Sequence, residues 1–342
     1  MTVRILIEGI GGIGGIVATR LVQAGYNVTL ITNNREITEA INESGLIIQQ
    51  DHSHDQIPAS AHTYLTDLDE QIKFDMIFLI MKANSVIEAT KQSEPFLKET
   101  GYVATFQNGI VEDEVQAILG SKKAVPVTVG FGGTMIEPGI YRKTSDGGFH
   151  IGELDENRTK RIEELAEILS HVDQVTVSDN MRGVLWAKLA INCTINTLGA
   201  ITGQTLGEML KDKRMRVLFL DTYREVVDVA HGLGIELEPV TNNPYLLYLS
   251  EDANWINRLI KDLIVRFIGR KYRQVKSSTL QSIERGRKSE IDILNGFVVN
   301  KAAEIGIAVP VNQAITEVMH MIDSGELQLT PDNIELLLEK IS

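Results

Sequence analysis

The chain contains 342 residues, which is enough for two ordinary domains with substantial cores, or for one large domain. Apolar residues make up 43 % of it and charged residues 23 %, a balance typical of a globular protein. The formal net charge of −13 argues against non-specific binding to nucleic acid or anionic membranes, because both require a basic surface. The single cysteine, Cys193, excludes an intramolecular disulfide and a cysteine-rich metal site, and its apolar neighbours favour a buried structural thiol.

The first half of the chain alternates strand-like and helix-like segments. Apolar runs rich in branched residues predict strands at Val3–Ile7, Asn27–Ile31, Phe74–Met81, Tyr102–Phe106 and Ala124–Val129. Helical patterns lie between several of them, as at Ile13–Ala24 and Ile110–Leu119. Continuous apolar strands separated by helices predict a parallel sheet that is covered on both faces.

The pattern changes after this alternation. Hairpin-like, glycine-rich sequence over Gly130–Glu153 predicts an antiparallel edge added to the same sheet. From about Ser178 the chain reads as helical, with helices predicted at Met181–Leu198, Lys213–His231, Asn254–Arg270, Lys276–Glu284, Glu290–Glu304 and Asn312–Ile322. We therefore expect an α/β domain over residues 1–175 and an all-α domain over residues 176–342. No signal peptide and no uninterrupted apolar span of about 18 residues is present, so we expect a cytoplasmic protein.

A glycine-rich turn, Gly9-Ile10-Gly11-Gly12-Ile13-Gly14, follows the first predicted strand and opens the first predicted helix. Gly9 permits the tight turn, Gly11 lets the backbone approach a pyrophosphate, and Gly14 lets the helix pack on the strand. Free N–H groups at the start of the helix attract the anion. In this strand–turn–helix context the motif predicts a Rossmann-type domain that binds a dinucleotide through Gly9–Gly14.

The end of the second predicted strand indicates which dinucleotide binds. An acidic residue there usually binds the ribose 2′-hydroxyl of NAD, but the segment Leu30–Asn34 has none, and the first carboxylate is Glu36. Arg35 can instead hold a 2′-phosphate in a charge-assisted hydrogen bond. We therefore predict NADPH as the cofactor. The alternative is that Arg35 simply begins a solvated helix.

Two further predicted strands are followed by polar residues, at the end where open α/β sheets bind ligands. Lys82 follows one of them, in Met81-Lys82-Ala83-Asn84, and Asn108 follows the other, in Gln107-Asn108-Gly109. A lysine just past a buried strand is often only a solvated strand end. Its position on the crevice side favours a ligand contact.

One helical stretch of the second half sets polar residues in apolar surroundings. Lys188, Asn192 and Asn196 are spaced i, i+4, i+8, so they share one face and climb about 6 Å per step. Such residues are unfavourable in a buried stripe unless a ligand satisfies them, whereas the alternative is a solvated helix face. A lysine can protonate the oxygen of a carbonyl that receives hydride, especially if burial lowers its pKa, and asparagines can orient the substrate. We predict Lys188 as a general acid.

A second polar cluster lies near the end of the chain. Ser289 with Asp292 is typical of a helix N-cap box, which would place Glu290 in the first turn of a new helix. On one straight helix Ser278 and Glu290 would lie about 18 Å apart. The break at Arg285-Gly286-Arg287 would allow the two to converge.

Taken together, these residues resemble the ketopantoate reductase (2-dehydropantoate 2-reductase) family over nearly the whole chain. The resemblance rests on motifs in a fixed order: the N-terminal G-x-G-x-x-G, Met81-Lys82-Ala83, Gln107-Asn108-Gly109, Trp186-x-Lys188 with Asn192 and Asn196, Ser277-Ser278, and Glu290-Ile291-Asp292 before Asn295-Gly296. Each motif is loose by itself, and their order is specific.

The resemblance implies a Rossmann domain followed by a helical domain like the C-terminal domain of 6-phosphogluconate dehydrogenase. The implied activity is reduction of 2-dehydropantoate to (R)-pantoate by NADPH, in the biosynthesis of pantothenate and coenzyme A. Lys82 and Asn108 would lie between the cofactor and the substrate.

The resemblance also implies roles in the helical domain. Lys188 would be the general acid, while Asn192 and Asn196 would hold the substrate. Ser278 would bind the substrate carboxylate. Glu290 would bind a substrate hydroxyl and help to set the charge on Lys188.

This sequence departs from the family pattern at several positions. Thr279 and Ser282 stand where the family usually has Met and Asp, and Val275 stands where Asn is common. The segment Ser250–Arg273 is longer than usual, and Glu8 replaces a small or apolar residue before the first glycine. These changes spare the predicted chemical residues but affect substrate contacts.

Two other functions therefore stay open. One is a paralogous NAD(P)H-dependent reductase of another 2-oxo acid, which Val275 and the long segment favour. The other is a non-enzymatic dinucleotide-binding regulator, which would need no buried lysine. For partners we expect a small 2-keto acid, no nucleic acid, membrane or metal, and a homodimer through the apolar C-terminal helices.

Overall fold

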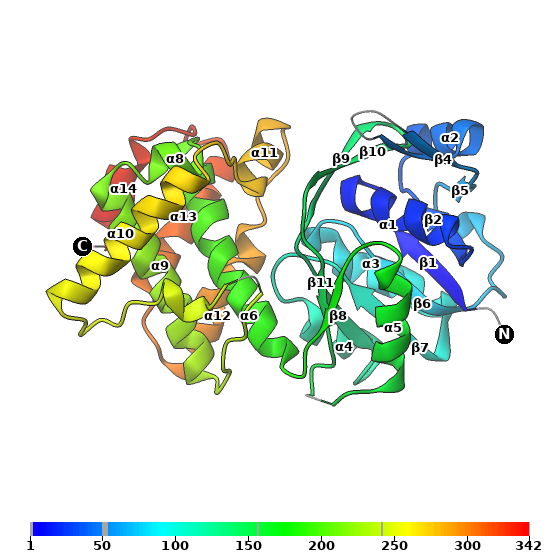
Figure 1. Cartoon of the computed structure of the whole chain (residues 1–342), viewed down its shortest axis with the longest axis horizontal. Coiled ribbons are helices and arrows are strands. Elements are labelled where there is room, and N and C mark those ends of the chain that lie inside the picture. Colours follow the sequence, from blue (N-terminus) through cyan, green and yellow to red (C-terminus); the bar gives the residue numbers. More distant parts are fainter. Residues whose placement is uncertain (1–2, 50–53, 156, 241, 342) are drawn as a thin grey trace. The chain divides into compact units, whose positions relative to one another are not determined.

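The computed structural model describes residues 3–49, 54–155, 157–240 and 242–341. It divides into two compact units, each drawn in Figure 1. The first unit comprises Met1–Gln107 and Val111–Met181. The second comprises Arg182–Ser342 together with the short stretch Asn108–Ile110.

The first unit is built on an eight-stranded sheet in the order β12-β11-β8-β7-β6-β1-β2-β5. The strands from β8 to β5 in this order are mutually parallel, which confirms the predicted parallel sheet. The bounds are β1 (Arg4–Glu8), β2 (Asn27–Ile31), β5 (Ala61–His62), β6 (Phe74–Leu79), β7 (Leu97–Thr105), β8 (Ala124–Val129), β11 (Phe149–Ile151) and β12 (Val175–Val177).

The register of this sheet brings four strand ends level with one another. Glu8 at the end of β1 pairs with Ile31 of β2 and with Leu79 of β6, and Leu79 pairs with Thr105 of β7. The loops that follow these strands therefore leave the sheet at one edge. The connection reverses direction between β1 and β6, and such a switch point is where open α/β sheets bind ligands.

Helices cover both faces of this sheet. They are α1 (Gly12–Gln23), α2 (Arg35–Ser44), α3 (Val86–Ser93), α4 (Glu112–Leu119) and α5 (Lys160–Ser170), with short 3₁₀ turns η1 (Leu65–Asp67), η2 (Ala83–Ser85) and η3 (Glu94–Phe96). Helix α1 contacts α5, whereas α3 contacts α4. Successive residues Ile5, Leu6 and Ile7 of β1 are all fully buried, as expected for a strand that is covered on both sides.

A second, four-stranded sheet has the order β4-β3-β10-β9, with bounds β3 (Leu46–Gln49), β4 (His54–Ile57), β9 (Gly132–Glu137) and β10 (Ile140–Ser145). The prediction that Gly130–Glu153 extends the main sheet is therefore wrong for β9 and β10, and correct only for β11, which pairs antiparallel with β8. The hairpin packs on α1 instead. Gly15 leaves room for it, because a Cβ there would lie only 2.1 Å from the ring of Tyr141.

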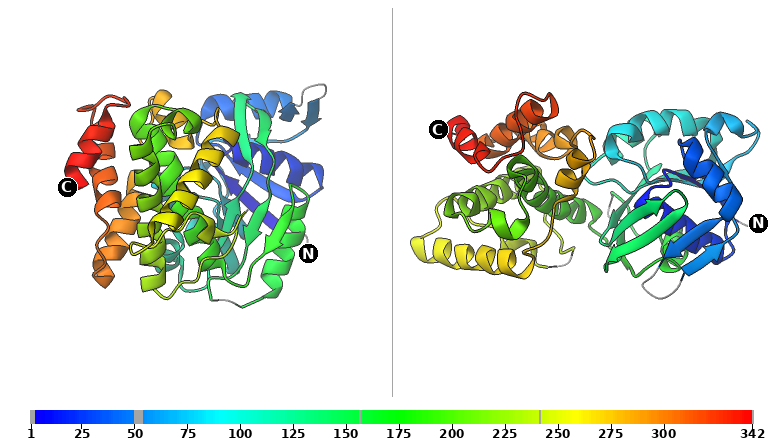
Figure 2. Two further views of the ribbon diagram at one scale, coloured as in Figure 1. Left: turned by 60° about the vertical axis from the view of Figure 1, so that its left-hand side comes forward. Right: turned by 90° about the horizontal axis from the view of Figure 1, so that it is seen from above.

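The second unit is all-helical, as predicted (Figure 2). Its elements are α6 (Met181–Ile191), the π-helical turn η4 (Asn192–Asn196), α7 (Thr197–Thr202), α8 (Leu206–Met209), α9 (Lys213–Gly232), η5 (Pro244–Leu246), α10 (Trp255–Lys271), α11 (Ser278–Glu284), η6 (Ile291–Ile293), α12 (Asn295–Ile305), α13 (Pro310–Asp323) and α14 (Asn333–Ile341). Its core centres on α7, α9 and α13, with Leu198, Phe219 and Ile315 fully buried.

The predicted helix Glu290–Glu304 is wrong at its start. The α-helix begins at Asn295, and Glu290 precedes the 3₁₀ turn η6 instead. The predicted cap box does not form, because the Ser289 backbone N–H donates to Asp323 instead of Asp292, at 3.0 Å. The Ser289 hydroxyl also donates to Asp323, at 2.5 Å, and it accepts from Ile291 N at 3.3 Å. Asp292 pairs with the His320 ring at 2.7 Å.

The continuous helical stretch Met181–Thr202 is the one described segment long and apolar enough to cross a membrane by composition alone. The most apolar part of this stretch is 78 % buried. The core helix of a folded protein has the same properties, so the stretch is weak evidence for a membrane span.

Candidate active site

The glycine turn after β1 has the geometry that its spacing predicts. Gly9 has a φ of +93°, in the left-handed region, and a Cβ there would lie 2.8 Å from the carbonyl oxygen of Ile80. At Gly14 a Cβ would lie 2.0 Å from the carbonyl oxygen of Gly9. Both positions therefore require glycine, one for the turn and one for the close packing of α1 on it.

Gly11 differs from its neighbours because a Cβ there would meet no described protein atom within 4 Å. It is the N-cap of α1, and among the described residues no side chain caps this helix and no acidic residue occupies its first turn. The first N–H groups of the helix are therefore left for an anion. The open side at Gly11 and this uncapped helix start suit the pyrophosphate of a dinucleotide.

The second sheet supports the turn from outside, which the sequence motif does not reveal. The Tyr141 hydroxyl in β10 donates to the carbonyl oxygen of Ile10 at 3.3 Å. A Cβ at Gly12 would lie 2.4 Å from the carbonyl oxygen of Gly133 in β9. The extra glycines at positions 12 and 15 were the available signal that another element packs here.

The end of β2 carries neutral polar groups. Asn34 caps α2, its side-chain oxygen accepting from Ile37 N at 3.1 Å, and Thr32 donates to the carbonyl oxygen of Asn34 at 2.7 Å. Arg35 is the first residue of α2, is 85 % exposed, and pairs with Glu39 at 2.9 Å. An exposed i, i+4 pair of this kind is worth only about 0.5 kcal/mol, so it holds the guanidinium weakly.

Gln107 connects the ends of β6 and β7. Its amide nitrogen donates to the carbonyl oxygens of Leu79 and Met81, at 2.8 and 3.1 Å. This brace fixes the backbone that leads to Lys82, whose side chain is exposed just before η2. Gln107 itself is buried, so in this motif it has a structural role that sequence reasoning did not assign.

Glu8 is the residue directly before the turn, and it is only 1 % exposed. Burial raises the pKa of its carboxyl from 4.5 to about 7, and a hydrogen bond from Ser93 partly opposes this shift. One of its oxygens, Oε1, has no hydrogen-bond partner among the described residues.

In the helical unit, the two predicted asparagines lie in the π-helical turn η4. The side-chain nitrogen of Asn196 donates to the side-chain oxygen of Asn192 at 3.1 Å, so the structure brings these two residues together. Asn192 is 9 % exposed, and its own side-chain nitrogen has no hydrogen-bond partner among the described residues. π-Helical turns often mark functional sites, and a buried unused donor suits a ligand oxygen. Lys188, partly buried, lies one turn earlier in α6.

Of the two adjacent serines, Ser277 has a structural role and Ser278 is exposed. The Ser277 hydroxyl donates to the backbone carbonyl of Asn196 at 3.0 Å and accepts from Leu280 N at 3.1 Å, so it both caps α11 and ties it to η4. Ser278, the first residue of α11, is exposed. This arrangement places the start of α11 beside the asparagine turn. Ser277 was part of the sequence motif, but its structural role was not predicted.

Glu290 and the stretch Asn108–Ile110 both lie near the turn η6 of the second unit. Gly109 approaches the turn η6 so closely that a Cβ would lie 2.7 Å from the carbonyl oxygen of Ile293. Glu290, which directly precedes η6, is 7 % exposed. Asn108 is therefore next in sequence to a residue that packs on the Glu290 turn.

Cys193 is buried within η4, as predicted, and burial raises the pKa of its thiol well above the usual range. Its backbone carbonyl accepts from the Asn295 side chain at 3.1 Å. In the described part of the chain, no three His, Cys, Asp or Glu side chains group closely enough to hold a metal ion.

Comparisons with known proteins agree with this description. The family profile "Ketopantoate reductase PanE/ApbA" matches residues 5–156, and its C-terminal counterpart matches residues 180–323. A 2-dehydropantoate 2-reductase of Pyrococcus horikoshii is 29 % identical over 310 residues, which cover 90 % of this chain and 94 % of that protein.

Solved structures extend the likeness to the fold. A PanE/ApbA family ketopantoate reductase of Ralstonia eutropha aligns with a TM-score of 0.78 at 27 % identity, over 94 % of this chain and 99 % of that one. A D-mandelate dehydrogenase, solved with NADH and anilino(oxo)acetate, has a TM-score of 0.80 at 21 % identity, over 94 % and 98 % of the two chains. The chain therefore belongs to the ketopantoate reductase PanE/ApbA family of oxidoreductases.

Proposed function

We propose that the protein reduces 2-dehydropantoate to (R)-pantoate with NADPH, a reaction of pantothenate and coenzyme A biosynthesis in the cytoplasm. The observation that carries the proposal is the pair of features described above, an uncapped glycine turn and a buried asparagine turn one helical turn after Lys188. The relatives at up to 29 % identity that bear the name of this reductase support the same substrate.

Cofactor binding is assigned to the first unit. The backbone of Gly9–Gly14 would hold the pyrophosphate, since the open side at Gly11 admits it without a clash. Arg35 would exchange its weak surface pair with Glu39 for the 2′-phosphate, a stronger charge-assisted contact. Lys82 would contact the cofactor from the loop after β6, and Asn108 would contribute from the short stretch after β7 that belongs to the second unit. NADPH supplies the hydride when it is bound.

The helical unit would bind and protonate the keto acid. A carbonyl that accepts hydride leaves negative charge on its oxygen, and the Lys188 ammonium would donate the proton that this oxygen takes. The unused side-chain N–H of Asn192 would donate to the substrate, and its bond from Asn196 fixes the orientation of the amide. Ser278 would hold the substrate carboxylate.

Glu290 would accept a hydrogen bond from the substrate hydroxyl and favour the charged form of Lys188. Its burial beside η6 makes it a fixed acceptor rather than a mobile surface carboxylate.

A second 2-oxo acid is the alternative substrate, and two observations favour it. Thr279, next to the proposed carboxylate-binding serine, is buried in this structure, and the family usually has methionine there. The D-mandelate dehydrogenase neighbour, solved with NADH and an oxoacetate, has the same fold. Side chains around a shared mechanism can therefore set different specificities.

The test is a panel of 2-oxo acids with both reduced nicotinamides. The purified protein should oxidise NADPH fastest with 2-dehydropantoate, and more slowly with 2-oxo-3-methylbutanoate, 2-oxo-4-methylpentanoate and 2-oxo-2-phenylacetate. A clear preference for the phenyl compound with NADH would replace the proposed substrate with the alternative. Absence of oxidation with every acid, by a protein that still binds NADPH, would contradict the reductase itself.

A further inference from the structure

Helix α10 (Trp255–Lys271), which occupies most of the long segment that departs from the family pattern, carries an uncovered apolar face. Ile256, Leu259, Ile260 and Leu263 are 47–53 % exposed, Phe267 is 66 % exposed and Trp255 is 73 % exposed. In the view from above in Figure 2 the helix, coloured yellow, runs along the outer side of the helical unit. Single exposed apolar residues are ordinary, but six on one helix are a surface that binds something.

The exposed residues form a stripe rather than a scatter. At 100° per residue, the five from Ile256 to Phe267 fall within an arc of about 100° on the outward side. The opposite side holds the helix in place: Val265 and Gly269 are buried, and a Cβ at Gly269 would lie 2.9 Å from Leu210. Apolar residues repeating every three or four positions form the seam that one helix presents to another.

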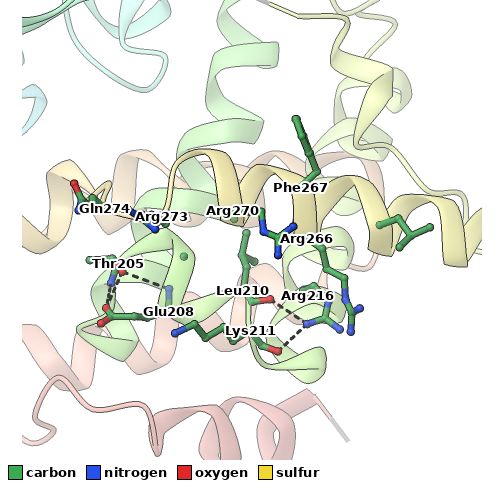
Figure 3. Close-up of a pocket in the computed structure, with 13 residues that line it drawn as sticks. Thr205, Glu208, Leu210, Lys211, Arg216, Arg266, Phe267, Arg270, Arg273 and Gln274 are labelled. Atoms are coloured by element: carbon green, nitrogen blue, oxygen red, sulfur yellow. Dashed lines mark hydrogen bonds between the residues drawn. The ribbon is translucent and has the colours of Figure 1, made fainter.

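Two adjoining hollows, which share Arg216, Leu263 and Arg266 in their lining, lie along one flank of the helix. One, of about 960 Å³, lies between α8 and the C-terminal half of α10 and includes Leu263, Phe267, Arg270 and Arg273 in its lining. The other, of about 490 Å³, lies between α9 and the N-terminal half and includes Leu259 and Val217. Figure 3 shows the first hollow, with the side chains of Arg266 and Arg270 below the helix and Phe267 on its upper side. Exposed side chains of a second copy of the same surface can enter such a hollow.

The area of the stripe agrees with a stable protein contact. The five side chains of the stripe and the neighbouring Trp255 together expose roughly 700 Å² per chain, taking usual residue areas of about 180 Å² for Ile and Leu and more for the aromatic residues. A standard interface buries about 800 Å² on each partner, so the stripe and its rim are sufficient.

Charge is distributed unequally about the middle of α10, at Leu263. Residues 251–262 contain three acidic and two basic side chains, a net charge of −1. Residues 264–276 contain five basic and no acidic side chains, a net charge of +5. Two such segments repel when they pair in parallel, and they attract when they pair antiparallel.

We propose that α10 packs antiparallel against α10 of a second copy of this chain, about a two-fold axis near Leu263. In that register Phe267 contacts Leu259 of the second copy, and Ile256 enters the hollow beside Arg270. Trp255 comes to lie against Lys271 of the second copy, where a cation–π contact is available. The acidic pair Glu251 and Asp252 approaches Arg273.

An anionic membrane is the other surface that a basic amphipathic helix can bind. The charge pattern favours the second copy, because Glu251 and Asp252 begin the exposed segment and the chain as a whole carries −13. A membrane would attract one end of α10 and repel the other. An anionic membrane has no positive groups with which the acidic end of the segment could pair.

The first test is the oligomeric state of the full chain, measured by light scattering over a concentration series. The wild type should have twice the mass of one chain, and Leu263→Asp should have the mass of one chain. Tyr64→Asp is the matched control, since Tyr64 is 55 % exposed but lies in the first unit, and it should remain dimeric. A monomeric wild type would overturn the proposal, as would a Leu263→Asp variant that remains a dimer.

Cross-linking tests the register directly. Trp255 and Lys271 lie eight residues on either side of Leu263, about 12 Å along the helix. Neither Trp255→Cys nor Lys271→Cys alone should form a disulfide-linked dimer, whereas the co-expressed pair should link together. The native thiol of Cys193 does not interfere, because it is buried. Self-linking of Trp255→Cys would show a parallel pair and contradict the proposed axis.

Vesicle flotation separates the membrane from the second copy. The wild type should stay with the soluble fraction for vesicles of phosphatidylcholine alone and for vesicles with added phosphatidylglycerol. Flotation that requires phosphatidylglycerol and is abolished by Leu263→Asp, with monomeric protein in solution, would assign α10 to a membrane and overturn the proposal.

Discussion

The buried carboxyl of Glu8 leads to a prediction about stability. Its pKa is raised from 4.5 to about 7 because burial penalises the charged form more than the hydrogen bond from Ser93 favours it. In the unfolded chain the same group ionises near its ordinary pKa. Between these two values the unfolded chain releases its proton while the folded chain keeps it, so the free energy of unfolding falls as pH rises through this window.

The size of this loss follows from the two pKa values. At roughly 1.4 kcal/mol per pH unit, the difference between 4.5 and about 7 corresponds to about 3 kcal/mol. The penalty is absent below pH 4.5, develops between pH 4.5 and 7, and is complete above pH 7. Glu8 is 1 % exposed, so solvent screening does not reduce the figure appreciably.

Glu8→Gln should remove this pH dependence, because the amide has nearly the same shape and does not ionise. The free energy of unfolding of the variant, minus that of the wild type, should increase by about 2–3 kcal/mol from pH 4 to pH 8. Both free energies are measured by urea unfolding followed by circular dichroism. Glu36→Gln, an exposed carboxylate of α2, is the control for loss of one surface charge. A Glu8→Gln difference that is equal at pH 4 and pH 8 would refute a neutral, buried carboxyl.

Three further predictions concern the site. Gly15→Ala should destabilise the fold by at least about 1–3 kcal/mol, because its Cβ would lie 2.1 Å from a buried tyrosine ring. Gly11→Ala should keep the wild-type melting temperature and bind the cofactor more weakly. Equal melting temperatures for the two variants would contradict this difference. Ser277→Ala should lower stability by about 1 kcal/mol through the lost helix cap, whereas Ser278→Ala should leave stability intact and raise KM for the keto acid. Arg35→Ala should weaken NADPH more than NADH in a fluorescence titration, and equal weakening of both would exclude a phosphate contact.

Local motifs carried most of the correct prediction. The alternation of apolar strands with helices, and the glycine turn of Gly9–Gly14, depend on contacts between residues close in sequence. The structure therefore has the predicted parallel sheet and the predicted geometry at Gly9 and Gly14. The spacing of Asn192 and Asn196 likewise predicted that they share a face, and they bond to each other.

The predictions that were wrong concern segments whose structure depends on residues far away in the sequence. The hairpin β9–β10 has the same strand pattern whichever sheet it joins, and it leaves the main sheet because Gly12 and Gly15 of α1 let it pack there. Ser289 has the sequence of a helix cap box, but Asp323, 34 residues later, accepts the backbone N–H that Asp292 would accept in that box. The π-helical turn at Asn192 has no signal in the spacing, because the polar stripe is the same in an α-helix.

The most direct test of the central claim is the turnover of Lys188→Ala with 2-dehydropantoate and NADPH, compared with the wild type and with Lys213→Ala, which removes an exposed lysine from the same unit. Turnover of Lys188→Ala should fall by about 100- to 10,000-fold, the usual range for a lost general acid, while NADPH affinity and the activity of Lys213→Ala stay near wild type. Turnover of Lys188→Ala within a few-fold of wild type would contradict the account.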